Sequence, residues 1–189
     1  MSGQTAPEIN QPAQTVPTDW IDWQLLEAGE ILMQTDKAGR GTVKIDLAIM
    51  IDADREAIWD VLTACEISPE YVPHVVGCRM LDSIDEGRSE LFIQTVKPAF
   101  FVPKFEHVFR LDYLPPYRIN VRRVSGPIEI MDGYWHLLPR PDGRFALLHA
   151  MTLNPGFPVP RLFVRNTLKR DLPIVLNEIR ERSEAAASR

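Results

Sequence analysis

The chain has 189 residues, of which 45% are hydrophobic and 25% are charged, the balance of an ordinary single-domain globular protein. This composition excludes a fully disordered chain, a collagen-like repeat and a disulfide scaffold. The formal net charge of -5 arises at the start, because residues 1–36 contain six acidic and no basic side chains. The remainder is nearly neutral and lacks the positive charge that nucleic-acid binding requires, so nucleic acid is not an expected partner.

Localisation and redox state follow from what the sequence lacks. No apolar run approaches the roughly 20 residues of a transmembrane helix, and residues 1–20 lack the basic and apolar regions of a secretory signal. These features predict a cytoplasmic protein. In a reducing compartment we expect Cys65 and Cys78 to be buried thiols rather than a disulfide.

Residues 1–17 are rich in Pro, Gln, Thr and Ala and poor in large apolar side chains, which predicts a disordered tail. Residues 18–41 form a predicted N-terminal extension. Thr18 and Asp19 are candidate caps of a short helix that presents two tryptophans, and an additional strand is expected near residues 30–35.

The strongest pattern runs from Thr42 to Ile51, where large apolar side chains occupy every second position, as in a strand with one buried face. A helix capped by Asp52 or Asp54 follows. A second short helical turn is expected before Pro73, which ends it.

The second half of the chain predicts a meander. Turn residues separate six expected strands, over residues 75–82, 88–97, 104–114, 117–125, 129–139 and 144–154. Short connections join antiparallel neighbours. A long amphipathic helix opens at Pro160 and continues to about Ser183, with Pro173 expected to bend it. The fold class is therefore α+β: a curved antiparallel sheet wrapped around a long C-terminal helix, with an internal hydrophobic cavity between them.

Three stretches carry a family resemblance: Ile51-Asp52-Ala53 leading into Ile58–Thr63, Pro69–Val75 leading into Met80-Leu81, and Gly133–Pro139. They resemble the START-like (SRPBCC) helix-grip superfamily, which includes START lipid-transfer domains, coenzyme Q-binding START-like proteins and polyketide cyclases/dehydrases. The resemblance covers the domain predicted over residues 42–185. It implies a helix-grip fold and a hydrophobic ligand held between sheet and helix. The superfamily shares no catalytic motif, so no catalytic residue is assigned.

Strand parity indicates which side chains line the cavity. In residues 104–114 the odd positions form an aromatic face interrupted by His107, and across the Pro115-Pro116 turn we expect His107 to lie opposite Arg123. The last strand places a second histidine, His149, among apolar groups. The predicted ligand-binding residues are His107, Phe109, Leu111, Tyr113, Val121, Arg123, Trp135, Phe145, His149 and Met151.

Two interpretations of the polar members are open. In the first, His107, Arg123 and His149 orient the polar end of a hydrophobic ligand. In the second, the histidines hydrogen-bond internally and a one-residue bulge turns Arg123 to solvent. No nucleophile elbow, glycine-rich phosphate loop or metal-ligand spacing is present, so neither a cofactor nor a metal is expected.

Two functions from different classes are therefore open. The favoured hypothesis is binding or transfer of a lipid, quinone or polyketide-like molecule. The alternative is an aromatase/cyclase-type enzyme, in which His107 supplies acid–base chemistry and Arg123 stabilises an enolate.

The connections at 98–103, 125–128 and 155–159 are expected at one end of the sheet, because alternate turns of a meander share an end. Two of these connections, 98–103 and 155–159, are unusually apolar. The second leads directly into the long helix, which carries a basic stripe at its start. The aromatic entrance candidates and the basic stripe are Phe100, Phe101, Phe157, Arg161, Arg165 and Lys169. These residues either dock transiently on an anionic membrane surface or form an aromatic lid beside an ordinary solvated face.

Overall fold

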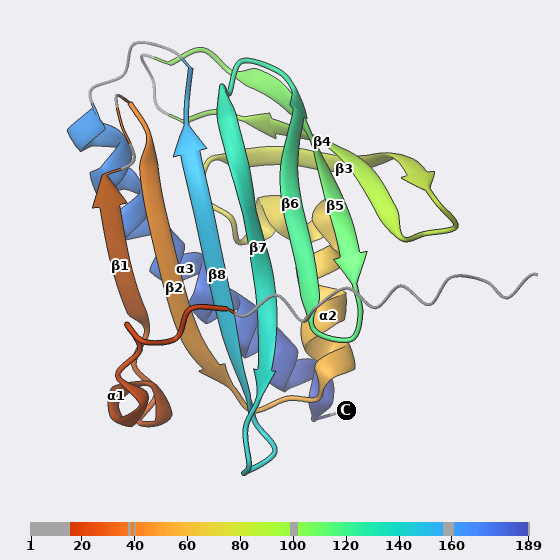
Figure 1. Cartoon of the computed structure of the whole chain (residues 1–189). Helices are drawn as coiled ribbons and strands as arrows, with labels where there is room; N and C mark the ends of the chain where they lie inside the picture. The colour runs from red at the N-terminus through yellow and green to blue at the C-terminus, as the bar shows by residue number, and fades with distance from the viewer. Residues whose placement is uncertain (1–15, 38, 40, 99–101, 157–160, 189) are drawn as a thin grey trace, which may run out of the picture.

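The computed structural model describes residues 16–37, 39, 41–98, 102–156 and 161–188. Within them, one antiparallel eight-stranded sheet has the order β1-β2-β8-β7-β6-β5-β4-β3, with α3 running diagonally behind it in Figure 1. The elements in chain order are α1 (Trp23–Glu27), β1 (Leu32–Lys37), β2 (Val43–Ile51), α2 (Arg55–Thr63), the 3-10 helix η1 (Cys65–Glu70), β3 (Val75–Ile84), β4 (Ser89–Val96), β5 (Phe105–Leu114), β6 (Arg118–Ser125), β7 (Ile130–Pro139), β8 (Phe145–Asn154) and α3 (Arg161–Ala187). The predicted meander and long helix are confirmed.

The N-terminal extension contains the expected short helix and additional strand, α1 and β1. The predicted cap was wrong. Asp22, not Thr18 or Asp19, is the N-cap, and its carboxylate accepts hydrogen bonds from the backbone N–H groups of Gln24 and Leu25. Thr18 instead closes a preceding turn, in which its carbonyl accepts from the N–H of Ile21.

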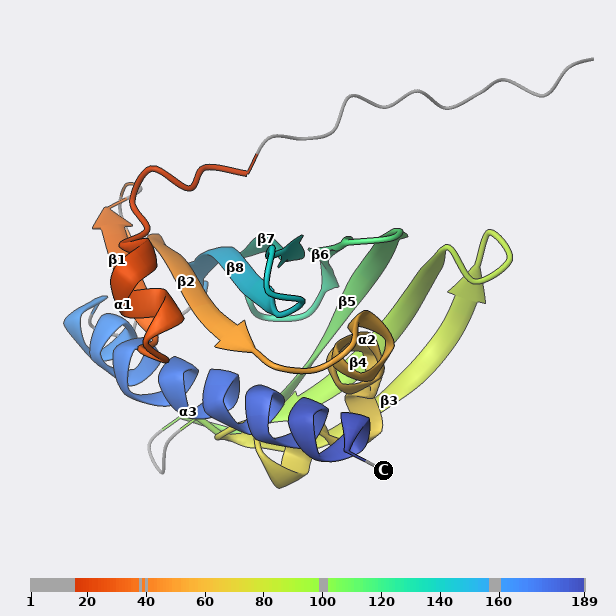
Figure 2. The same cartoon turned by 90° about the horizontal axis from the view of Figure 1, so that it is seen from below.

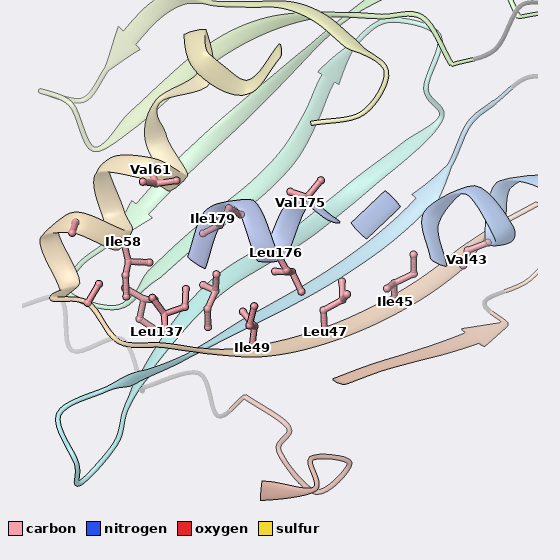
Figure 3. Close-up of a cluster of buried hydrophobic side chains, with 14 residues drawn as sticks. Val43, Ile45, Leu47, Ile49, Ile58, Val61, Leu137, Val175, Leu176 and Ile179 are labelled. Carbon is pink, nitrogen blue, oxygen red and sulfur yellow. The ribbon is translucent and has the colours of Figure 1, made fainter. Parts of the chain in front are cut away.

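The sheet curves strongly, and Figure 2 shows α3 lying across its concave side, with α2 inside the curve near β4 and β5. The largest buried cluster joins β2, α2, β7, β8 and α3. In Figure 3 its side chains converge from these elements, among them Leu47 and Ile49 of β2 and Leu176 and Ile179 of α3. All four are almost fully buried, so this packing anchors one half of α3 against the sheet.

A second cluster covers the opposite face of β2 and β8. Ile21 and Leu26, from the N-terminal extension, pack against Ala48 and Met50 of β2. From Leu47 to Ile51, β2 is therefore buried on both faces, which explains why Ala48 and Met50 occupy its outward positions there. The extension closes the core on the side away from α3.

The cysteine prediction was wrong. Cys65 and Cys78, which are 13 positions apart in sequence, form a disulfide with their Cα atoms 5.5 Å apart. The bond joins the start of η1 to β3, because the turn after η1 folds the chain back along that helix and brings the two residues within disulfide range. Within the described residues, no helix combines the length and the apolar character needed to cross a membrane.

Candidate functional site

A cavity of about 220 Å³ lies between the concave face of the sheet, η1 and α3. Strands β4 to β8 supply one wall, and the segment from α2 to the turn after η1, together with α3, supplies the other. The lining residues are Leu62, Ala64, Cys65, Ser68, Tyr71, Val72, Gln94, Phe109, Leu111, Val121, Met131, Trp135, His149, Met151, Leu172, Val175 and Ile179.

The lining is apolar apart from a few neutral groups. None of the described residues that line the cavity carries an Asp, Glu, Lys or Arg side chain. Its polar side chains include Ser68, Tyr71, Gln94 and His149. Elsewhere in the described chain, no three His, Cys, Asp or Glu side chains are grouped so that they could hold a metal ion. The chemistry available is therefore hydrogen bonding within an apolar surface.

The state of His149 is set by its backbone partner. Its Nδ1 lies 3.0 Å from the carbonyl oxygen of Tyr134, and because a carbonyl only accepts, Nδ1 carries the proton. Burial lowers the pKa of His149 to about 4, which keeps the ring neutral at pH 7. Nε2 then presents an unprotonated lone pair, and no described residue donates a hydrogen bond to it.

His107 is buried beside the cavity and acts on a lining residue. Its Nε2 lies 3.0 Å from Oε1 of Gln94, its directly paired neighbour on β4. The bond leaves the NH2 group of Gln94 without an acceptor among the described residues. Burial lowers the pKa of His107 to about 4, so it holds Gln94 in place as a neutral ring.

Ser68 is the third neutral polar group of the wall. It lies in η1 and is 8% exposed, yet its hydroxyl has no hydrogen-bond partner within the described structure. Buried hydroxyls are normally paired. The unpaired hydroxyl therefore marks a position where a ligand oxygen or nitrogen would be stabilised.

Of the predicted ligand-binding residues, the structure places six together in the cavity lining: Phe109, Leu111, Val121, Trp135, His149 and Met151. The other four lie elsewhere. Tyr113 lines a separate open cleft, and Phe145 packs its ring 6.3 Å from that of Tyr117. His107 lies behind Gln94, and Arg123 is directed to a turn.

The predicted register between β5 and β6 was wrong by two residues. Arg123 lies opposite Phe109 rather than His107, and Leu114 pairs with Arg118. The turn occupies residues 115–117, one position later than the prediction assumed, which moves β6 along by two. An even shift preserves the face of each side chain, so Leu111 and Val121 still point to the cavity.

Arg123 braces the turn between β6 and β7. Its Nε donates to the carbonyl oxygen of Ile128, and its Nη2 donates to that of Gly126 at 2.8 Å. An irregularity in the β5–β6 register lies beside it, where Val108 pairs with Ser125. Arg123 is therefore bonded to the β6–β7 turn and is not among the described residues that line the cavity.

The entrance candidates Phe100, Phe101 and Phe157 lie outside the described residues. The expected proximity of the connections 125–128 and 155–159 is nevertheless seen in contacts between described residues in and beside them. The N–H of Glu129 donates to the carbonyl oxygen of Asn154 at 2.9 Å. Gly156 lies so close that a Cβ there would be 2.5 Å from the carbonyl oxygen of Pro127.

A second, more open cleft of about 460 Å³ lies at the opposite end of β5. Its residues are Arg55, Trp59, Thr63, Met80, Gly87, Glu90, Tyr113 and Pro115. The charged groups here already have protein partners. Arg55 pairs with Glu56, and the carboxylate of Glu90 accepts from the hydroxyl of Tyr113.

Sequence reasoning missed Ser68 and Gln94. Parity alone would have assigned Gln94 to the same face as Phe92, which is 1% exposed, so a polar residue on an inward face was an available signal. Ser68 carried no such signal, because a 3-10 helix has no simple inward period over six residues.

Comparisons with known proteins concern the fold and the family. No curated protein sequence gives a significant match. Among solved structures, the Zhui aromatase/cyclase from a Streptomyces species is similar, with a TM-score of 0.63, 16% identity, and coverage of 76% of this chain and 94% of that one. The STAR-related lipid transfer protein of Xanthomonas axonopodis gives 0.65 and 15%, with coverage of 80% and 98%.

Human STARD10 has a TM-score of 0.66 and 12% identity, with coverage of 94% of this chain and 84% of that one. These likenesses establish the shared START-like helix-grip fold. The family model described as polyketide cyclase / dehydrase and lipid transport matches residues 51–180, which include α2, η1, strands β3 to β8 and most of α3. The chain therefore belongs to the polyketide cyclase / dehydrase and lipid transport family.

Proposed function

We propose that this protein binds a hydrophobic small molecule in the cavity between the sheet and α3. The observation that carries the proposal is the lining itself: apolar side chains, neutral polar groups and no charged residue among those described. Such a surface gains free energy by burying apolar ligand area. A family that includes lipid transport supports the same function.

Native mass spectrometry of the gently purified chain tests this proposal. We expect an additional mass that is lost on denaturation. Ala64→Phe, which places a ring into the cavity wall, should abolish it, while Ala185→Phe on the exposed end of α3 should retain it. Equal ligand content in both variants would contradict binding in this cavity.

Binding is proposed in preference to cyclase chemistry. A polyketide cyclase needs an acid or base and a positive group beside an enolisable ketone. Arg123, the cation assigned to that role, is committed to two carbonyl oxygens of the β6–β7 turn. We expect no aromatic product from a poly-β-ketone mimic. Turnover that disappears in His107→Ala would overturn this preference.

We also propose transient contact with anionic membranes through the first turns of α3. Leu162 is 61% exposed, and exposed Lys169 lies seven residues later on the same helix face. An apolar side chain beside a cation suits an anionic lipid surface.

Co-sedimentation with vesicles containing phosphatidylglycerol tests membrane contact. Binding should fall with added salt and should be lost in Leu162→Ser. Ile174→Ser removes a comparably apolar side chain, 48% exposed, farther along α3 and should bind as the unaltered chain does. Equal recovery with neutral and anionic vesicles would contradict the proposal.

We also propose a cytoplasmic location. Separation of the source cells into cytoplasmic, membrane and exported fractions should recover the chain in the cytoplasmic fraction. Recovery mainly in the exported fraction, where disulfides such as Cys65–Cys78 persist, would contradict that location.

A further inference from the structure

The polar groups of the cavity restrict the chemistry of its occupant. His149 is 3% exposed, and with Nδ1 committed to the Tyr134 carbonyl its remaining nitrogen is an acceptor. Facing the same cavity are the unpartnered hydroxyl of Ser68 and the NH2 group of Gln94. The wall thus offers a ring nitrogen of His149 that can accept a hydrogen bond, and two groups, on Ser68 and Gln94, that can donate one.

An anionic ligand does not fit this arrangement. No described lining residue carries a positive charge, and burying a carboxylate without a counter-charge is strongly unfavourable. The bare Nε2 lone pair of His149 would also repel it. The described lining therefore favours a neutral molecule.

Size restricts the occupant as well. The cavity volume is about 220 Å³, whereas an apolar cavity of about 150 Å³ holds benzene. A bicyclic ring system is therefore of suitable size, and the aromatic rings of Phe109 and Trp135 in the wall provide faces on which it can pack.

We propose that the cavity selects an uncharged, ring-sized apolar molecule bearing a hydroxyl, which donates its hydrogen to Nε2 of His149 while its oxygen accepts from Ser68 or Gln94. This inference rests on the proposed binding function and adds the ligand class to it. The ligand hydroxyl would donate to Nε2 of His149, the ring nitrogen of the described cavity wall that accepts no hydrogen bond from the protein, whereas an apolar analogue of the same shape would leave this nitrogen unpaired.

Three probes of matched shape test the inference: 2-naphthol, naphthalene and 2-naphthoate. Equilibrium dialysis at pH 7.5 should show 2-naphthol binding about fivefold to tenfold more tightly than naphthalene, the factor that one hydrogen bond supplies. 2-Naphthoate should bind more weakly than either. In NMR, the ¹⁵N shift of His149 Nε2 should move on addition of 2-naphthol.

His149→Phe removes the acceptor but keeps a ring that can stack on Trp135. It should bind 2-naphthol and naphthalene with equal affinity. His136→Phe is the matched control, since His136 neighbours Trp135 on β7 but does not line the cavity, and it should keep the preference. If His149→Phe fails to fold, the relative affinities of the three probes for the unaltered chain still test the preference for a neutral hydroxyl-bearing ligand.

The outcomes separate the two proposals. Equal binding of 2-naphthol and naphthalene by the unaltered chain would overturn the hydroxyl inference and leave hydrophobic binding intact. Tighter binding of 2-naphthoate would overturn it in favour of an anion site. Failure of all three probes to bind would contradict the binding function and the inference with it.

Discussion

The imidazole of His149 stacks on the indole of Trp135, with ring centroids 3.7 Å apart and ring planes at 18°. The two residues are paired directly across β8 and β7, and both line the cavity. The imidazole that faces the ligand space is thus held flat against an aromatic reporter group.

Trp135 should therefore report on occupancy. Adding cyclohexanol, which is spectroscopically silent, should change tryptophan emission, because it alters the surroundings of this indole. Trp135→Phe should lose most of that response. Trp23→Phe should retain it, since Trp23 lies in α1, where Arg140 is 4.2 Å from its ring centroid. A response that survives Trp135→Phe would place the alcohol elsewhere.

Acid should destabilise the fold through its buried histidines. Burial lowers the pKa values of His107 and His149 to about 4, while an unfolded histidine titrates near about 6.5. As pH falls from about 6.5 to 4, the unfolded chain binds protons that the folded chain does not. Stability is therefore lost across this window, by up to about 3 kcal/mol for each ring, and these rings contribute no pH dependence above about pH 7.5.

Urea unfolding at pH 7.5, 6 and 5 measures this effect. His107→Gln keeps a hydrogen-bonding side chain opposite Gln94 but removes a titrating group, so the fall in unfolding free energy between pH 7.5 and 5 should be smaller. An identical fall in the variant and the unaltered chain would show that His107 is not held neutral.

Much of the fold followed from the sequence because it depends on local pattern. The period of two from Thr42 to Ile51 and the spaced turns after residue 75 identified seven of the eight strands, β2 to β8. Parity also identified cavity residues such as Leu111 and Val121, since the two-residue error in register left their faces unchanged.

The remaining parts of the site depend on tertiary packing. Tyr113 and Phe145 have the predicted face but lie beyond the cavity, whose length is set by where α2 and η1 pack. Arg123 is drawn to turn carbonyls beside a register irregularity that no periodicity reveals. Ser68 reaches the cavity only because η1 folds against the sheet.

A hydrogen-bonded pair joins the turn after η1 to α3, the two parts of the helical wall of the cavity. Nε2 of His74 lies 3.0 Å from Oδ2 of Asp171 on α3, and neighbouring Val72 and Leu172 both line the cavity. Asp171 is 8% exposed, so Asp171→Asn should lower the unfolding free energy by about 2 kcal/mol.

Urea denaturation checks this prediction. Asp60→Asn, on the exposed side of α2, is the control and should leave the midpoint unchanged. His74→Asn should reproduce much of the Asp171 effect, because asparagine tolerates the φ of 70° at this position. An unaltered midpoint in Asp171→Asn would mean that the pair does not support the wall.

The disulfide should stabilise the same region. Cross-linking residues 13 apart in sequence is worth about 3 kcal/mol by loop-closure entropy. Dithiothreitol should lower the unfolding temperature of the unaltered chain but not that of the Cys65→Ala/Cys78→Ala variant. Two reactive thiols in the denatured, unreduced protein would contradict the bond.

The most direct test of the account is methyl NMR of the chain labelled at its methionines and titrated with 2-naphthol. Met131 and Met151 line the cavity, whereas Met80 lines the open cleft at the other end of β5 and Met50 packs beneath α1. The methyl signals of Met131 and Met151 should shift together and saturably, with intermolecular contacts to the probe, while those of Met80 and Met50 stay in place. Shifts confined to Met80 would put the ligand in the open cleft and contradict the account.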